Sequence, residues 1–102
     1  MKKIIDGKLF NTETAERICS TGFSSPGDFS YWKDTLYKTK KGTYFIHGKG
    51  GPRSHYAVNI GNNTISGSEE MWTVGEDVAK KFCEENDVSK AEELFGEEIE
   101  EG

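Results

Sequence analysis

Apolar residues occur in short clusters along this chain, and their spacing predicts a mixture of strands and helices. Near the start, the pairs Ile4-Ile5 and Leu9-Phe10 flank the dipeptide Asp6-Gly7. Asp-Gly suits a tight primed turn, in which both central residues have positive φ. The pattern therefore predicts a small hairpin over residues 3–10.

A helical pattern follows this hairpin. Ala15, Ile18 and Cys19 fall on one side of a helix, and Gly22 can end it. We expect a first helix between residues 11 and 22.

Aromatic and β-branched residues predict strands from residue 30 to residue 60. Apolar groups stand on both sides of Lys40-Lys41-Gly42, which predicts a hairpin with a basic tip. Alternation over residues 55–60 predicts a third strand. We expect residues 70–74 to be its companion and the glycine-rich segment 61–68 to be a surface connection.

The last third of the chain has helical periodicity. Val78, Ala79, Phe82 and Cys83 share one helix face, and the apolar residues after position 90 repeat this spacing. Two capping boxes open these helices, formed by Thr73 with Glu76 and by Ser89 with Glu92. Together the elements predict an α+β fold, a small antiparallel sheet packed by two to three helices.

Length and composition favour a single domain over residues 1–102. A chain of 102 residues suffices for one modest core, and its 12% aromatic content compensates for only 33% hydrophobic residues. No long apolar run follows the basic start, so we expect no signal peptide, no membrane span and a cytoplasmic protein. Cys19 and Cys83 are expected on helices as free, buried thiols.

Charge divides the chain into a basic, strand-rich part and an acidic, helical part. Residues 1–60 carry ten Lys/Arg against five Asp/Glu, a net charge of +5, whereas residues 61–102 carry three against thirteen, a net charge of −10, and the sum is −5. A field of one sign concentrated on one surface attracts molecules of the opposite charge. The division therefore indicates a binding role.

Signals for catalysis or metal binding are weak. His47 and His55 bracket the glycine-rich segment 48–54, which is either a flexible strand connection or an anion cradle, but it lacks the spacing and the following helix of a P-loop. The two histidines and two cysteines have no short spacing typical of zinc ligands. Both cysteines lie in apolar stripes, which disfavour a reactive thiolate. We expect no enzyme, no metal and no cofactor.

Acidic residues of the last helices form the first candidate binding site. Carboxylates at helical steps of three and four residues imitate the charge of a phosphate backbone, and their mutual repulsion would be relieved by a basic partner. The alternative is a solubilising C-terminus. The candidate partner-binding residues are Glu84, Glu85, Asp87, Glu92, Glu93, Glu97 and Glu98.

Basic residues interleaved with aromatic ones form the second candidate site, for nucleic acid. Cations would meet phosphates and rings would stack on bases. Because the sequence pI is about 5.0, such binding requires that the charges separate onto two faces. The candidate residues are Lys38, Lys40, Lys41, Lys49, Arg53, Tyr37 and Tyr44.

The stretch from Tyr31 to Gly51, opened by Lys3-Ile4-Ile5-Asp6-Gly7-Lys8, resembles small uncharacterised proteins carried by phages and mobile elements of Gram-positive bacteria. This resemblance runs nearly end to end. It implies a phage-type anti-CRISPR inhibitor, a DNA mimic that binds a host CRISPR-Cas effector and blocks its nucleic-acid binding or cleavage through an acidic surface. It implies no catalytic residues. The alternative is a small nucleic-acid-binding accessory or regulatory protein that uses the basic aromatic hairpin.

Overall fold

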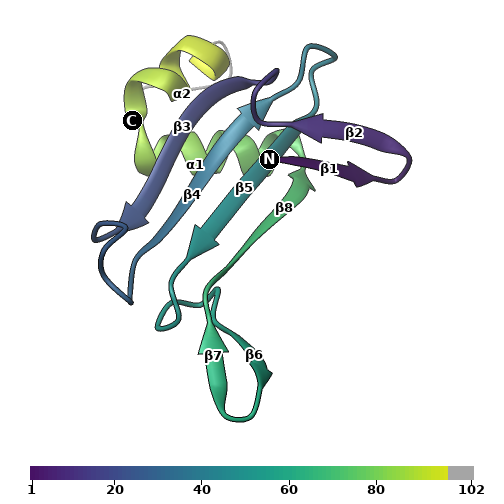
Figure 1. Ribbon diagram of the computed structural model, residues 1–102. Coiled ribbons are helices and arrows are strands. Elements are labelled where there is room, and N and C mark those ends of the chain that lie inside the picture. The colour runs from purple at the N-terminus through teal and green to yellow at the C-terminus, as the bar shows by residue number, and fades with distance from the viewer. Residues whose placement is uncertain (97–102) are drawn as a thin grey trace.

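The computed structural model describes residues 1–96 and contains a central antiparallel sheet of four strands (Figure 1). These strands, in their spatial order, are β3 (Glu16–Phe23), β4 (Trp32–Lys38), β5 (Tyr44–Gly50) and β8 (Ser68–Val74). Two further hairpins are formed by β1 (Lys2–Ile5) with β2 (Lys8–Asn11) and by β6 (Val58–Gly61) with β7 (Thr64–Ser66). The described helices are α1 (Glu76–Asn86) and α2 (Val88–Phe95). The α+β prediction is confirmed, with two helices in the described residues and more sheet than expected.

One face of the sheet is covered by α1 and α2, which lie behind it in Figure 1. Register pairs Leu36 with Ile46 and Ile46 with Trp72, so these apolar side chains point to the same face. They pack with residues of both helices in the main core. The buried members of this core are Ile18, Cys19, Leu36, Tyr44, Ile46, Ala79, Cys83, Ala91 and Phe95.

The opposite face is covered at one end only, by the β1–β2 hairpin. Phe10 of β2 is 3% exposed and meets Phe45 edge to face, with ring centroids 5.4 Å apart. Met71 completes this second, smaller cluster, and Tyr37 stacks on Phe45. The rest of this face has no second layer, and that open area holds the candidate site described below.

The first helix predicted at residues 11–22 is wrong, because the chain forms a turn and then β3. Asn11 does accept a hydrogen bond from the Glu13 amide (2.9 Å), but this cap closes a single turn. A bulge between Arg17 and Cys19 then lets both Ile18 and Cys19 join the core on the helix side. Two adjacent apolar residues fit a helix stripe as well as a bulged strand, and pairing with β4 decides for the strand.

The third predicted strand is also misplaced. Residues 58–61 form β6, but its partner is β7, which lies within the segment expected to be a connection. Residues 70–74 belong to β8 and pair with β5. Tyr56, expected in the strand, is buried in the preceding loop, where it occupies the space above Gly48.

Both predicted capping boxes are wrong, although both helices exist. Thr73 is paired with Phe45 inside the sheet, and α1 begins after Gly75 without a side-chain cap. Ser89 lies inside α2, whose cap is Asp87, which accepts a hydrogen bond from the Lys90 amide. Among residues 1–96 no helix has the length and apolarity needed to span a membrane.

Candidate anion-binding surface

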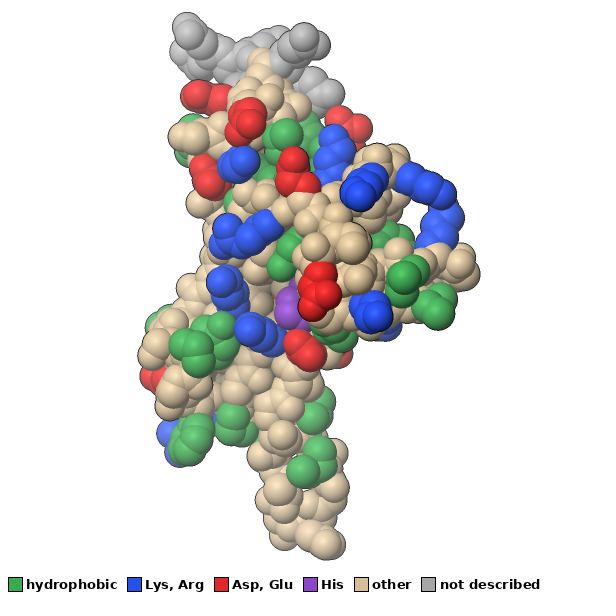
Figure 2. Space-filling view, turned by 45° about the horizontal axis from the view of Figure 1, so that its top comes forward, with side chains coloured by type: hydrophobic (Ala, Val, Ile, Leu, Met, Phe, Trp, Pro, Cys, Tyr) green, Lys and Arg blue, Asp and Glu red, His purple; other side chains and the backbone are tan. Residues whose placement is uncertain are grey.

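Basic side chains gather on the part of the sheet that the β1–β2 hairpin leaves open (Figure 2). Lys33 of β4 pairs with Lys49 of β5, and Lys49 lies four residues after Phe45, so both lysines share the face of that ring. Arg17 of β3 pairs with Tyr37 on the same face. We call Arg17, Lys33 and Lys49 the basic sheet surface.

The direct pairing of Lys33 with Lys49 carries an electrostatic cost. Like charges opposite each other on antiparallel strands are destabilising. Glu69 stands opposite Lys49 on the other side, but its carboxylate is 2.8 Å from Nε2 of His47. In the described part of the chain neither lysine forms an ion pair. A bound anion would relieve this repulsion.

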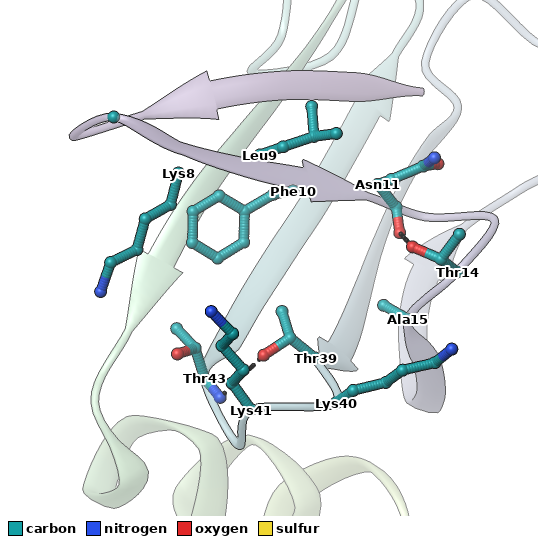
Figure 3. A pocket seen from close by; sticks show the side chains of 11 residues that line it. Lys8, Leu9, Phe10, Asn11, Thr14, Ala15, Thr39, Lys40, Lys41 and Thr43 are labelled. Carbon is teal, nitrogen blue, oxygen red and sulfur yellow. Dashed lines mark hydrogen bonds between the residues drawn. The ribbon is translucent and has the colours of Figure 1, made fainter.

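A cleft of about 540 Å³ continues the basic region between the β1–β2 hairpin and the turn that joins β4 to β5 (Figure 3). Lys41 of the turn extends toward the space below the ring of Phe10, Lys8 of β2 extends beside this ring at one end of the cleft, and Lys40 extends toward the other end. Hydroxyl and amide groups complete the lining, contributed by Thr39, Thr43, Asn11 and Thr14. The combination of ammonium groups with neutral donors fits a phosphate.

Local hydrogen bonds hold the turn that presents Lys40 and Lys41. The amide of Thr43 donates to Oγ1 of Thr39 (3.0 Å), and the amide of Gly42 donates to the Thr39 carbonyl (2.9 Å). Gly42 has φ of +89°, which favours glycine at this position. The two lysines therefore stand on a defined turn rather than on a loose loop.

The structure brings together only some of the basic residues proposed from the sequence. Lys49 lies on the basic sheet surface, and Lys40 and Lys41 line the cleft. Lys38 points to the helix side, with Nζ 5.4 Å from the ring centroid of Tyr44. Arg53 is exposed in the loop after β5.

The two proposed stacking rings point to opposite faces and are packed. Tyr37 lies parallel to Phe45, with ring centroids 5.2 Å apart, and is partly buried. Tyr44 is 7% exposed and belongs to the core under the helices. Neither ring is therefore fully exposed beside the basic sheet surface.

Sequence reasoning missed Lys8 and Arg17, and it counted Lys33 in the basic hairpin without selecting it as a candidate binding residue. For Lys33 a signal existed, because counting outward from the turn at residues 40–42 pairs Lys38 with Tyr44 and hence Lys33 with Lys49. For Arg17 there was none once its segment had been assigned to a helix. Predicting Lys8 as a site residue would have required knowledge of where the β1–β2 hairpin packs on the sheet.

The candidate acidic residues that the structure describes lie on the helical layer, behind the sheet. Glu84, Glu85, Glu92 and Glu93 are exposed, and we call them the acidic helical surface. Asp87 is partly buried and serves as the α2 cap, and Glu93 also contacts Lys90 (3.4 Å). Glu97 and Glu98 lie outside the described residues. The acidic helical surface and the basic sheet surface therefore lie on different layers, although Glu69 stands beside Lys49 on the sheet and Lys81 and Lys90 lie on the helices.

Neither cysteine lies on the basic sheet surface, since both belong to the core under the helices. Among residues 1–96 no three His, Cys, Asp or Glu side chains are grouped so as to hold a metal ion. Both cysteines are buried and free, as expected, although Cys19 lies on a strand rather than on a helix. Burial raises the pKa of Cys19 to about 12, which disfavours its thiolate.

Comparison with protein families, with characterised proteins and with solved structures gave no match for this chain. The resemblance of residues 31–51 to phage-borne proteins therefore stays a prediction.

Proposed function

We propose that this protein is a non-enzymatic binding protein that holds the phosphate backbone of nucleic acid on the basic sheet surface and in the adjoining cleft. The observation that carries this proposal is the pairing of Lys33 with Lys49 on a sheet face that has no covering layer. Arg17 lies on the same face, and Lys8 and Lys41 extend the positive region. Phosphates would supply the missing counter-charges.

The proposed contacts are to the backbone rather than to bases. Cations on phosphates give affinity that depends steeply on salt and carries no sequence information. Base stacking would need an exposed aromatic ring, whereas Tyr37 is partly buried and stacks on Phe45, and Tyr44 is buried under the helices. We therefore expect binding that depends little on sequence.

Fluorescence anisotropy with labelled single-stranded and duplex oligonucleotides, measured from 50 to 200 mM salt, tests this function. Lys33→Ala and Lys49→Ala should each weaken binding and lower the slope of log affinity against log salt by about one. Lys81→Ala removes an exposed charge from α1 and is the matched control, expected to change affinity far less. Absence of binding by the unaltered protein at 50 mM salt, or equal losses in all three variants, would refute the proposal.

A second candidate function is inhibition of a host CRISPR-Cas effector by the acidic helical surface. What supports it is the exposure of Glu84, Glu85 and Glu92 on the layer that faces away from the basic sheet surface. Carboxylates in this arrangement would occupy a groove meant for nucleic acid, in the cytoplasm of a bacterial host.

An assay of binding to the CRISPR-Cas effector distinguishes the two candidate functions. In a pull-down from nuclease-treated host lysate, an inhibitor would recover one effector complex, and Glu84→Lys with Glu85→Lys would abolish that recovery. Lys33→Ala would leave it unchanged. If partners are lost on nuclease treatment, the inhibitor function is excluded and the nucleic-acid function gains support.

A further inference from the structure

Two thiols that are 64 residues apart in the chain meet in the core. Cys19 lies on β3 and Cys83 on α1, and their Sγ atoms are 3.5 Å apart. The residues are 3% and 0% exposed. A disulfide has its sulfurs at about 2.0 Å, so a shift of roughly 1.5 Å, shared between two side chains, would bring them to bonding distance.

The position of this pair in the topology gives the bond a mechanical consequence. α1 follows β8 at one edge of the central sheet, whereas β3 forms the other edge. Figure 1 shows α1 running behind the sheet between these edges. A covalent link at Cys83 would therefore tie the helical layer to the strand most distant from its own point of attachment.

We propose that Cys19 and Cys83 form a redox modification site, at which a low-molecular-weight disulfide such as oxidised glutathione converts the two thiols into an intramolecular disulfide. In the first exchange the thiolate of one cysteine attacks a glutathione sulfur, the S–S bond of glutathione breaks, and one glutathione thiolate leaves. In the second, the other cysteine attacks the protein sulfur of the mixed disulfide and releases the other glutathione. The protein loses two electrons and two protons, and oxidised glutathione becomes two reduced molecules. This site goes beyond the proposed binding function and does not depend on it.

Burial raises the pKa of both thiols, so their thiolates are disfavoured inside the core. Neither thiol reaches solvent in the closed fold, so the first exchange proceeds through opening of the helical layer. The oxidation rate should accordingly rise with low concentrations of denaturant.

Oxidation should stabilise the folded protein. The bond closes a long loop that includes β4, β5, β8 and most of α1, and long closed loops gain the most from a cross-link. We expect an increase in Tm of about 10 °C or more over the reduced protein.

The test uses the full chain in glutathione buffers of increasing oxidised fraction. Intact mass spectrometry should show a loss of about 2 Da, peptide mapping should join Cys19 to Cys83, and thermal unfolding should show the rise in Tm. Thiols that stay free in oxidised glutathione alone, cross-links only between chains, or an oxidised form with a lower Tm would each overturn the proposal.

Two single-cysteine variants test the two exchanges separately. Cys19→Ala should stop at the mixed disulfide on Cys83, and Cys83→Ala at the mixed disulfide on Cys19, a gain of one glutathione in each case. If either variant fails to fold, the comparison of reduced with oxidised unaltered protein still decides, since it changes no residue.

Discussion

At the residue scale, Gly48 shows how one absent side chain shapes the fold. A Cβ at this position would overlap Oη of Tyr56 and would lie 2.7 Å from Oδ1 of Asp34. Tyr56 uses this space to reach Asp34, to which its hydroxyl donates a hydrogen bond. The Ser68 hydroxyl donates a hydrogen bond to the Tyr56 carbonyl (2.6 Å), which ties the same loop to β8. The glycine thus lets a loop residue be buried against the sheet.

Gly48→Ala should lower the free energy of unfolding by about 2–3 kcal/mol, because the added methyl group displaces a buried ring. Gly27→Ala is the control, since a Cβ there meets no atom within 4 Å. Urea titrations of both variants measure the difference. Equal stability of the two variants would mean that the Tyr56 loop is free to move away.

Tyr56 also makes stability depend on alkaline pH. Burial and the Asp34 carboxylate raise the pKa of its hydroxyl above the ordinary value of 10.0. A raised pKa means that the fold holds the neutral form, so this stabilisation is complete below pH 10 and is lost as the pH rises further.

The free energy of unfolding of Tyr56→Phe, compared with that of the unaltered protein, checks this sign. At pH 8 the variant should be less stable by about 1–3 kcal/mol, since Asp34 loses its donor. Above pH 10 the difference in unfolding free energy should narrow, because Tyr56 of the unaltered protein ionises on unfolding and the phenylalanine of the variant cannot. A constant gap would contradict the assignment.

At the element scale, the two small hairpins have the same type of turn but differ in their packing. Positive φ occurs at Asp6 and Gly7 in one and at Asn62 and Asn63 in the other, as in primed turns. The β1–β2 hairpin lies on the sheet through Phe10, whereas the β6–β7 hairpin projects from the body (Figure 1). Only the first contributes to the core.

Phe10→Ala should cost about 3–4 kcal/mol of unfolding free energy, because it removes a buried ring that packs on Phe45. Leu9→Ala, one position along the same strand, removes a side chain of a residue that is 62% exposed and should cost less than about 1 kcal/mol. Chemical denaturation measures both. Comparable losses would show that the hairpin does not dock through Phe10.

At the scale of the whole molecule, the opposed charges of the two faces matter more than the net charge of −5. The acidic helical surface repels a polyanion even when it binds at the basic sheet surface, since surface charges act over about 10 Å at 0.1 M salt. Its influence on nucleic-acid binding should therefore be long-range and sensitive to salt.

Replacing Glu84, Glu85 and Glu92 by Gln should strengthen oligonucleotide binding several-fold at 50 mM salt, and the gain should shrink as salt is added. Titrations at 50 and 200 mM measure this dependence. A variant that loses nucleic-acid binding, or gains it equally at both salt concentrations, would exclude a purely electrostatic role for this surface.

The sequence by itself determined the local features of the protein. Asp6-Gly7 and the basic turn at residues 40–42 gave two hairpins, helical spacing gave α1 and α2, and the charge division gave two candidate surfaces. These features were predictable because turn conformation and amphipathic periodicity depend on neighbouring residues. Burial of both thiols followed in the same way from their apolar surroundings.

Only the tertiary structure decided where Tyr56 is buried, that residues 16–23 form β3 and that Arg17 joins the basic sheet surface. Ile18 and Cys19 suit a helix or a bulged strand, and pairing with β4 selects the strand. The meeting of Cys19 with Cys83 likewise depends on how α1 crosses the sheet. Contacts between residues distant in the chain depend on strand order and register, which local spacing does not specify, and such contacts bring Arg17 and Lys8 to the candidate anion-binding surface.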